Sequence, residues 1–294
     1  MEGNFVRIYI FFLIKTLVLT EVCVASESIL DQYPSNPLYS KPVEFIPNIW
    51  SAIGATAAPN YENSGHNNNL SFIVTPAGVV VINSGAAYIL AEALHNEIKE
   101  ITKMPVRLVI NENGQGHAML GNSYWREQNV PILAHVDAYE EFFKNSFQEL
   151  ERMKRYNLEK SEKTIITLPT DTFTEKKSLH IGGVKIEVLY LGPSHSPGDI
   201  VVWLPDLKLV ISGDMAFHER LLPIFPDTDT LGWIETWKNK FETLGAKYVI
   251  PGHGHPTNMD QVRRFTYDYL VHLRGLIQEH LDNGGELSSA YYVD

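Results

Sequence analysis

Three histidines and one aspartate stand where apolar runs of the sequence end. They are His117, His195, Asp214 and His253, and glycine or proline residues stand close to each of them. The apolar runs predict buried strands, and loops at strand ends deliver side chains from distant parts of a chain to one crevice. Neutral imidazoles and a carboxylate that meet in this way suit Zn²⁺ or a similar ion. One such histidine alone usually has a structural role, so it is the group of four that predicts a metal site.

The elements that must position these four residues include a repeat. Residues 70–85 predict two apolar strands joined by a turn at Pro76-Ala77-Gly78, and a helical stretch follows at 86–101. Residues 199–214 predict a second pair of strands, and after a loop a helical stretch follows at 230–245. A hairpin followed by a helix, found twice, predicts two related sheet halves that pack face to face.

The remaining predicted elements alternate between strands and helices, and no linker interrupts them. We therefore expect one domain over residues 49–294. Residues 26–48 before it are rich in proline and serine, and we expect them to be irregular. The further predicted elements are strands at 106–110, 131–135 and 248–253, a hairpin that turns at Gly182-Gly183, and helices at 137–156 and 259–281.

The N-terminal stretch resembles a secretory signal peptide. A short segment with Arg7 precedes an apolar run, and Val24-Ala25 precedes Ser26. A retained membrane anchor is the alternative, but the uninterrupted apolar run is well short of the ~20 residues that a span needs. We expect residues 1–25 to be removed and the mature protein to be secreted or periplasmic.

Composition narrows the classes of partner and of chemistry. The chain has 294 residues, and its net charge of −11 argues against nucleic acid or an anionic membrane as a partner, since both would repel it. The expected partner is a small-molecule substrate. The single cysteine, Cys23, lies in the N-terminal segment, so the mature chain offers no disulfide and no thiolate ligand. The lack of a thiol and of a Gly-x-Ser-x-Gly motif disfavours a nucleophilic hydrolase.

Two stretches carry a resemblance to a known family. They are GPSHSPGDIVVWLPDLKLVISGD at 192–214 and VIPGHGHPT at 249–257. Through them the chain resembles the metallo-β-lactamase superfamily, from about Asn60 to about His280. The resemblance implies a single-domain α/β fold, a four-layer αββα sandwich whose layers are the two halves of the repeat. It also implies a hydrolytic site for one or two metal ions at one edge of the sandwich.

The resemblance assigns metal ligands, and here the chain departs from the family. His195 matches the family's third histidine, Asp214 its bridging aspartate and His253 its last histidine. The family's opening loop has the pattern Thr-His-x-His-x-Asp-His, whereas this chain has NENGQGH at 111–117, in which only His117 keeps its type. The replaced positions are Asn111 for the threonine, Glu112 for the first histidine, Gly114 for the second, Gly116 for the aspartate, and Asn83 for an aspartate that usually lies behind the ligands.

The ligands that remain predict one firmly bound ion, with zinc as the expected metal. The family's second metal position keeps His117, His253 and Asp214, which is enough for a three-ligand site with water in the open place. Its first position keeps His195 and shares Asp214, and Glu112 could join them to hold a second ion. Otherwise, Glu112 could act as general base and His195 as an orienting group. Glu112, Asp214 and His195 are therefore the expected catalytic residues.

Three further histidines are candidates for the rim of the site. His255 follows His253 by two residues, and His218 closely follows Asp214. His66 lies in the asparagine-rich loop NSGHNNN, at a place where the family has a loop over the metal, although a polar turn is the simpler interpretation. We consider all three as candidate substrate contacts.

These residues predict metal-dependent hydrolysis of an ester, thioester or amide-type substrate. Two alternatives stay open. The loss of loop ligands also fits a non-catalytic binding protein that has kept the fold. Two histidines and a carboxylate also form the facial set of a mononuclear iron oxygenase acting on a small thiol, but the family's iron members need a histidine where Glu112 stands. The segment GDMAFHERLLPIF with WIETW resembles a periplasmic subgroup associated with quinoprotein oxidation systems, which leaves the substrate open.

Overall fold

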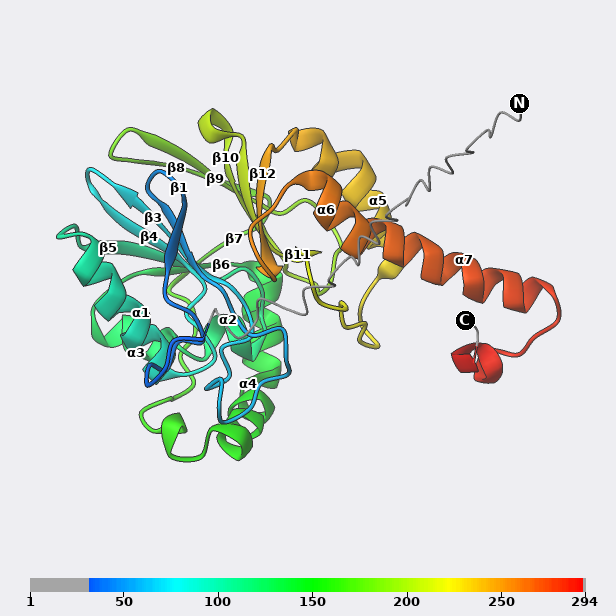
Figure 1. Ribbon diagram of the computed structural model, residues 1–294, viewed down its shortest axis with the longest axis horizontal. Helices are drawn as coiled ribbons and strands as arrows, with labels where there is room; N and C mark the ends of the chain where they lie inside the picture. The colour runs from blue at the N-terminus through cyan, green and yellow to red at the C-terminus, as the bar shows by residue number, and fades with distance from the viewer. Residues whose placement is uncertain (1–31, 293–294) are drawn as a thin grey trace, which may run out of the picture.

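Two β-sheets lie face to face at the centre of the structure, a computed structural model that describes residues 32–292 (Figure 1). One sheet has seven strands and the other has five. Apolar side chains of both inner faces pack together between the sheets, among them Ile73 and Val80 of the first and Val188 and Ile211 of the second. The predicted packing of two sheet halves is therefore confirmed.

The first sheet comes from the N-terminal half of the chain. Its strands lie side by side in chain order, antiparallel up to the fourth strand and parallel from there on. The predicted turn at 76–78 and the predicted strands at 106–110 and 131–135 are confirmed. The strands are β1 (Val43–Ile46), β2 (Ile49–Ala52), β3 (Leu70–Thr75), β4 (Gly78–Ile82), β5 (Val106–Ile110), β6 (Ile132–His135) and β7 (Asp171–Phe173).

The second sheet comes from the C-terminal half. The predicted hairpin at Gly182-Gly183 is confirmed, because Ile181 pairs with Val184 across that turn. The strands are β8 (Lys176–Ile181), β9 (Val184–Leu189), β10 (Val201–Leu204), β11 (Leu209–Phe217) and β12 (Tyr248–His253). Their order across the sheet is β12-β11-β10-β9-β8, and β12 lies parallel to β11.

Helices of the N-terminal half cover the outer face of the first sheet. α1 (Tyr88–Ile101) and α3 (Asn122–Glu127) pack there through Leu90, Leu94 and Trp125. Leu90 and Leu94 are buried because they are four residues apart and so lie on the same face of α1. Trp125 is buried where α3 packs against α1. The helix predicted at 86–101 is thus confirmed.

Helices of the C-terminal half cover the second sheet, which completes the αββα sandwich. α5 (Thr230–Thr236) packs on it through the buried Trp233, and α6 (Met259–Arg263) through Val262. Each of these helices continues into a π-helical turn, at Trp237–Phe241 and Arg264–Asp268, so the stretches predicted as single helices change pitch along their length. α7 (Tyr269–Asp282) then extends away from the sheets (Figure 1).

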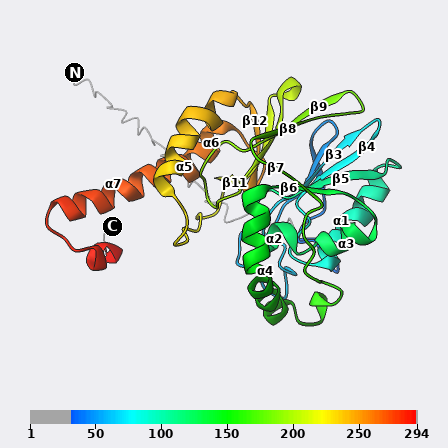
Figure 2. The same cartoon turned by 180° about the vertical axis from the view of Figure 1, so that it is seen from behind.

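The longest helix lies at the edge where the predicted ligands meet. α4 (Val136–Asn157) runs beside α2 (Gly116–Met119) and the ends of β6 and β7 (Figure 2). His135 caps it, because Nδ1 of this residue accepts a hydrogen bond from the backbone N–H of Asp137 at 3.2 Å. This helix was predicted at 137–156, but its contacts with the ligand loop were not.

One expectation about the N-terminal region needs correction. Residues 26–48 were expected to be irregular, yet Val43–Ile46 forms β1 and pairs antiparallel with β2, with Val43 opposite Ser51. The flanking prolines concealed this short edge strand, a position where proline is tolerated. The expected signal peptide at 1–25 lies outside the described residues. Within 32–292 no helix is both long and apolar enough to cross a membrane.

Candidate metal centre

Loops and strand ends at one edge of the sandwich bring the four predicted ligands to one cavity. His117 lies in α2, after the loop that follows β5, and His195 lies in the loop between β9 and β10. Asp214 lies within β11, and His253 is the last residue of β12. Because β11 and β12 are parallel neighbours, they deliver the aspartate and the histidine to the same edge.

Three of these side chains form a compact group of ligand atoms. One atom from each of His117, Asp214 and His253 lies within 4.8 Å of the others. Nε2 of His117 is 3.5 Å from Oδ2 of Asp214, and Nε2 of His253 is 3.2 Å from its Oδ1. These are the three residues expected to hold one firmly bound ion. Two imidazoles and a carboxylate are donors that Zn²⁺ accepts in proteins.

His195 lies next to this group. Its Nδ1 is 3.5 Å from Oδ2 of Asp214 and 3.3 Å from Nε2 of Gln115. The ring is buried and contacts Phe225 and Trp233 edge-on. His195 is therefore held against the aspartate that the predicted second ion would share.

A buried aspartate fixes the loop that carries His195. Asp199 accepts a hydrogen bond from the hydroxyl of Ser194 at 2.7 Å, and two from Ser196, from its backbone N–H at 2.7 Å and its hydroxyl at 2.5 Å. The two serines flank His195, so Asp199 sets the conformation of the turn that presents the imidazole. Sequence reasoning missed this role, although Asp199 belongs to the motif GPSHSPGD.

Glu112, which replaces a histidine of the family pattern, is buried beside His117. Its Oε1 accepts a hydrogen bond from Nδ2 of Asn83 at 2.8 Å and lies 3.5 Å from Nε2 of His117. Burial, together with the negative charge of Asp214, raises the pKa of Glu112 well above its usual range. A general base must be deprotonated, so this direction weighs against the base role, which stays a prediction.

Close packing around Glu112 requires a glycine in β11. A Cβ added at Gly213 would lie 1.5 Å from Oε2 of Glu112, and the backbone there has a φ of +52°. The register of β11 against β12 shifts on both sides of this residue. Irregularities of this kind re-aim side chains beside active sites, and Gly213 directly precedes Asp214.

The charges of the site favour neutral histidines around an ionised carboxylate. Burial lowers the pKa of His117 and of His253. Burial also opposes ionisation of Asp214, but the neighbouring imidazoles outweigh it and hold the pKa of this carboxyl well below its usual range. Metal ligation needs these protonation states.

Three buried polar atoms around the site lack a hydrogen-bond partner in the described part of the chain. They are Oε2 of Glu112, Nε2 of His195 and Oδ1 of Asp214, to which His253 is near but not aligned. An unsatisfied buried polar atom costs about 1–3 kcal/mol. A cation in contact with such acceptors would offset this cost, so the donor set fits a divalent metal ion.

His253 is held from behind by two groups. Its Nδ1 contacts the backbone carbonyl oxygen of Asn67, and Nη1 of Arg220 lies 2.9 Å from the same nitrogen. The carbonyl favours the tautomer with the proton on Nδ1, whereas the guanidinium favours the other. Ligation of a metal through Nε2 selects the first, in which the carbonyl orients the ring.

Two amides of the opening loop contact the ligands, and sequence reasoning missed both. Nδ2 of Asn113 donates to Oδ2 of Asp214 at 3.2 Å and lies 3.4 Å from Nε2 of His117. Gln115 approaches His195, as described above. Both residues occupy variable positions of the family pattern. The one signal in the sequence was that both have amide side chains in a loop that lacks several of the usual ligands.

The ligands line a cavity of about 420 Å³, a size that suits a small molecule. Arg152 and Arg220 bring positive charge to its walls, and Phe225 brings an apolar surface. Glu149 also lines it and pairs with Arg152 at 2.6 Å. The cavity therefore combines a candidate metal site with cationic side chains.

Of the three histidines expected at the rim, His66 is not there. It is fully buried, and its Nδ1 accepts a hydrogen bond from the backbone N–H of Tyr39 at 2.8 Å. Burial lowers its pKa to about 4, so the ring is neutral. The expectation of a rim position was wrong, because the asparagine-rich loop folds inward and uses His66 as a buried acceptor.

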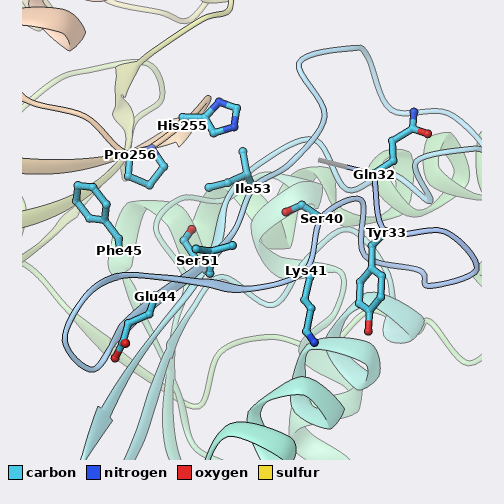
Figure 3. A pocket seen from close by; sticks show the side chains of 11 residues that line it. Gln32, Tyr33, Ser40, Lys41, Glu44, Phe45, Ser51, Ile53, His255 and Pro256 are labelled. Atoms are coloured by element: carbon cyan, nitrogen blue, oxygen red, sulfur yellow. The ribbon is translucent and has the colours of Figure 1, made fainter. Parts of the chain in front are cut away.

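His218 and His255 lie near each other but outside the lining of the metal-site cavity. Nδ1 of His218 is 2.9 Å from the backbone carbonyl oxygen of His255, and Nδ1 of His255 is 2.6 Å from Oε2 of Glu219. His255 lines a different pocket of about 450 Å³, with Pro256 beside it and Tyr33 at the far end (Figure 3). Neither histidine is placed to contact a substrate at the metal site.

Comparison with known proteins gives one family match. The family model described as "Metallo-beta-lactamase superfamily" matches residues 119–253. The chain is 24% identical over 193 residues to the "Metallo-beta-lactamase type 2" of Bacteroides fragilis, covering 62% of this chain and 70% of that protein. It is 27% identical over 129 residues to a "Linear primary-alkylsulfatase" of a Pseudomonas species, covering 40% of this chain but only 23% of the relative.

Solved structures share the fold. A metallo-beta-lactamase from Pontibacter korlensis superposes with a TM-score of 0.65 at 21% identity, covering 78% of this chain and 98% of that one. The structure of TMB-1 superposes with a TM-score of 0.63 at 16% identity, covering 79% and 96%. At these identities the similarity supports the αββα architecture alone.

Proposed function

The chain belongs to the metallo-β-lactamase superfamily, and on this premise we propose that it is a metal-dependent hydrolase of a small-molecule substrate. The observation that carries the proposal is the group formed by His117, Asp214 and His253, whose ligand atoms lie within 4.8 Å of one another beside the cavity. Two relatives named as hydrolases, a β-lactamase and an alkylsulfatase, support the same reaction type.

The chemistry divides between the ion and the protein. A divalent ion such as Zn²⁺ supplies an activated water and polarises the bond to be cleaved. His117 and His253 would hold the ion with neutral imidazoles, and Asp214 would add an ionised carboxylate. The backbone carbonyl of Asn67 keeps the His253 ring in place.

The cavity walls favour a substrate with an anionic group. Arg220 brings a guanidinium group to the cavity, where Arg152 is paired with Glu149, and such groups bind carboxylates, sulfates and phosphates. Esters, thioesters or amides that carry an anionic substituent therefore fit the proposal. We also propose that the mature protein is secreted or periplasmic, on the strength of the signal-like segment at 1–25.

A non-catalytic binding protein is the alternative that one observation favours. Gly114 and Gly116 stand where the family pattern has a histidine and an aspartate, so the opening loop lacks two ligands. A protein that had lost catalysis would keep the cavity and the fold without needing a metal. Metal content separates the two proposals directly.

The test is elemental analysis of the protein from Ser26 onward, purified without added metal. We expect close to one equivalent of zinc in the wild type, and loss of this zinc in the double variant His117→Ala/His253→Ala. His255→Ala serves as the control, because it removes a histidine from the other pocket and should leave the zinc in place.

Each outcome assigns a function. Zinc that depends on His117 and His253 supports a hydrolase and justifies a screen of ester, thioester and β-lactam substrates. Firmly bound iron in its place would indicate the oxygenase alternative. A wild-type protein without metal, even after zinc is supplied, would contradict the hydrolase and leave a binding protein.

A further inference from the structure

Helix α4 lies so close to the opening loop that two loop positions have no room for a side chain. A Cβ added at Gly114 would lie 2.6 Å from the backbone oxygen of Ala138 and 2.7 Å from Oε2 of Glu141. A Cβ added at Gly116 would lie 2.4 Å from Oε2 of Glu149. These are the two positions where the family pattern has a histidine and an aspartate. At Gly114 the obstacle includes the backbone of α4, whereas at Gly116 it is the end of the Glu149 side chain.

Glu149 brings a carboxylate next to position 116, where the family pattern has the aspartate. The backbone N–H of Gly116 donates a hydrogen bond to Oε2 of Glu149 at 3.2 Å. In an aspartate the carboxylate oxygens stand about 2.4 Å from their own Cβ, as bond lengths dictate. An oxygen of Glu149 therefore stands as far from a Cβ at position 116 as an aspartate's own oxygen would.

The second oxygen of Glu149 is available. Both hydrogen bonds that the described residues give to this carboxylate, from Gly116 and from Arg152 at 2.6 Å, go to Oε2. Glu149 also lines the cavity with His117, Asp214 and His253. Arg152 is at present the positively charged partner of the Glu149 carboxylate. A bound metal ion would provide a second positive partner for the same carboxylate.

We infer that Glu149 supplies the carboxylate that the loop has lost, so that the metal centre is completed from α4. The inference rests on the proposed metal-dependent function. Oδ1 of Asp214, a buried oxygen of the ligand group that has no hydrogen-bond partner among the described residues, indicates independently that a cation belongs at this edge. Glu149 lies outside the group of three whose ligand atoms are within 4.8 Å of one another, so its side chain would turn within the shared cavity to join His117, Asp214 and His253 when an ion is bound.

The test measures zinc affinity by competition with a chromophoric chelator, which requires no substrate. Glu149→Gln removes the charge and keeps the shape, and we expect zinc affinity to fall by at least about 10-fold. Glu151→Gln is the matched control, because Glu151 lies on the same helix, is paired with Lys154 at 2.9 Å and has a side chain that is 42% exposed. It should bind zinc as the wild type does.

A compensating variant tests the position of the carboxylate. Glu149→Ala should weaken zinc binding and also clear the space beside Gly116. Gly116→Asp in that background places a carboxylate on the loop, and we expect it to restore zinc affinity. The visible absorption bands of Co²⁺ bound in place of zinc should change in Glu149→Ala and return toward the wild-type spectrum in the double variant.

The outcomes separate this inference from the proposed function. Unchanged zinc affinity and an unchanged Co²⁺ spectrum in Glu149→Gln, with zinc binding lost in His117→Ala, would overturn the role of Glu149 and leave the metal site intact. A wild-type protein that binds no zinc would overturn both. A loss in Glu149→Gln that Glu151→Gln does not share supports the inference, and rescue by Gly116→Asp strengthens it.

Discussion

Among single residues, Gly213 is the one whose replacement has the most direct steric consequence. Gly213→Ala should destabilise the protein by about 1–3 kcal/mol or more, because the new methyl group meets Oε2 of Glu112. Gly183→Ala is the control: its φ of +82° is also in the left-handed region, but nothing lies within 4 Å of an added Cβ. Urea unfolding of both variants measures the difference, and equal losses would contradict the steric argument.

The buried ring of His66 should make the free energy of unfolding depend on pH. Its pKa is about 4 in the folded protein and 6.5 in its unperturbed state. Between these values the unfolded chain binds a proton that the folded chain refuses, so the stability from His66 is complete above pH 6.5 and is lost as pH falls toward 4. The loss between pH 7.5 and pH 5 amounts to about 2 kcal/mol.

Replacing His66 by a side chain that does not titrate should remove this part of the pH dependence. His66→Asn keeps an acceptor for the N–H of Tyr39, and its unfolding free energy should vary less between pH 7.5 and pH 5 than that of the wild type. His272→Asn, on the exposed surface of α7, is the control. The same pH dependence in His66→Asn and the wild type would show that other groups are responsible.

Some site residues could be predicted from the sequence because they follow predicted strands, whereas others are recognised only from the packing of the folded protein. His117, His195, Asp214 and His253 were predictable because each follows an apolar run within a glycine- or proline-rich loop. Glu149 was not, because it lies in the interior of a long amphipathic helix, where a glutamate usually faces solvent. Nothing in the linear sequence says which turn of α4 meets the loop.

Among the structural elements, the turn between β9 and β10 makes the clearest prediction. Asp199→Ala removes the acceptor for three hydrogen bonds from Ser194 and Ser196, and it should destabilise the protein by about 2–4 kcal/mol. Because the turn carries His195, the ring should also lose its fixed position beside Asp214. We expect the NMR resonances of the His195 ring to broaden in this variant. Sharp, unshifted resonances would contradict the role of Asp199 in fixing the turn.

The strands and helices were largely predictable, and the exceptions have physical causes. Apolar runs bounded by turn residues located β3, β4, β10 and β11. A strand that is buried on both faces has a continuous run of apolar residues, which is easy to recognise in a sequence. β1 was missed because its half-exposed residues and flanking prolines resemble a loop. The π-helical turns were missed because they lie inside helices whose hydrophobic spacing is otherwise regular.

The sandwich as a unit follows from the repeat of hairpin and helix, since each half offers one apolar face for the other to cover. The internal repeat was therefore enough to predict two packed sheets. It could not show how tightly α4 closes on the edge, because that contact joins the middle of a helix to a loop more than 20 residues away. The composition of the metal centre depends on this contact.

The close contact between α4 and Gly116 also limits how this chain can change over evolutionary time. An aspartate introduced at 116 meets the carboxylate of Glu149, whereas removal of Glu149 alone leaves the centre short of a ligand. Either substitution by itself is disfavoured, although the pair together is acceptable. Relatives that share the two loop glycines should therefore keep an acidic residue at the matching turn of the helix, and the two positions should vary together.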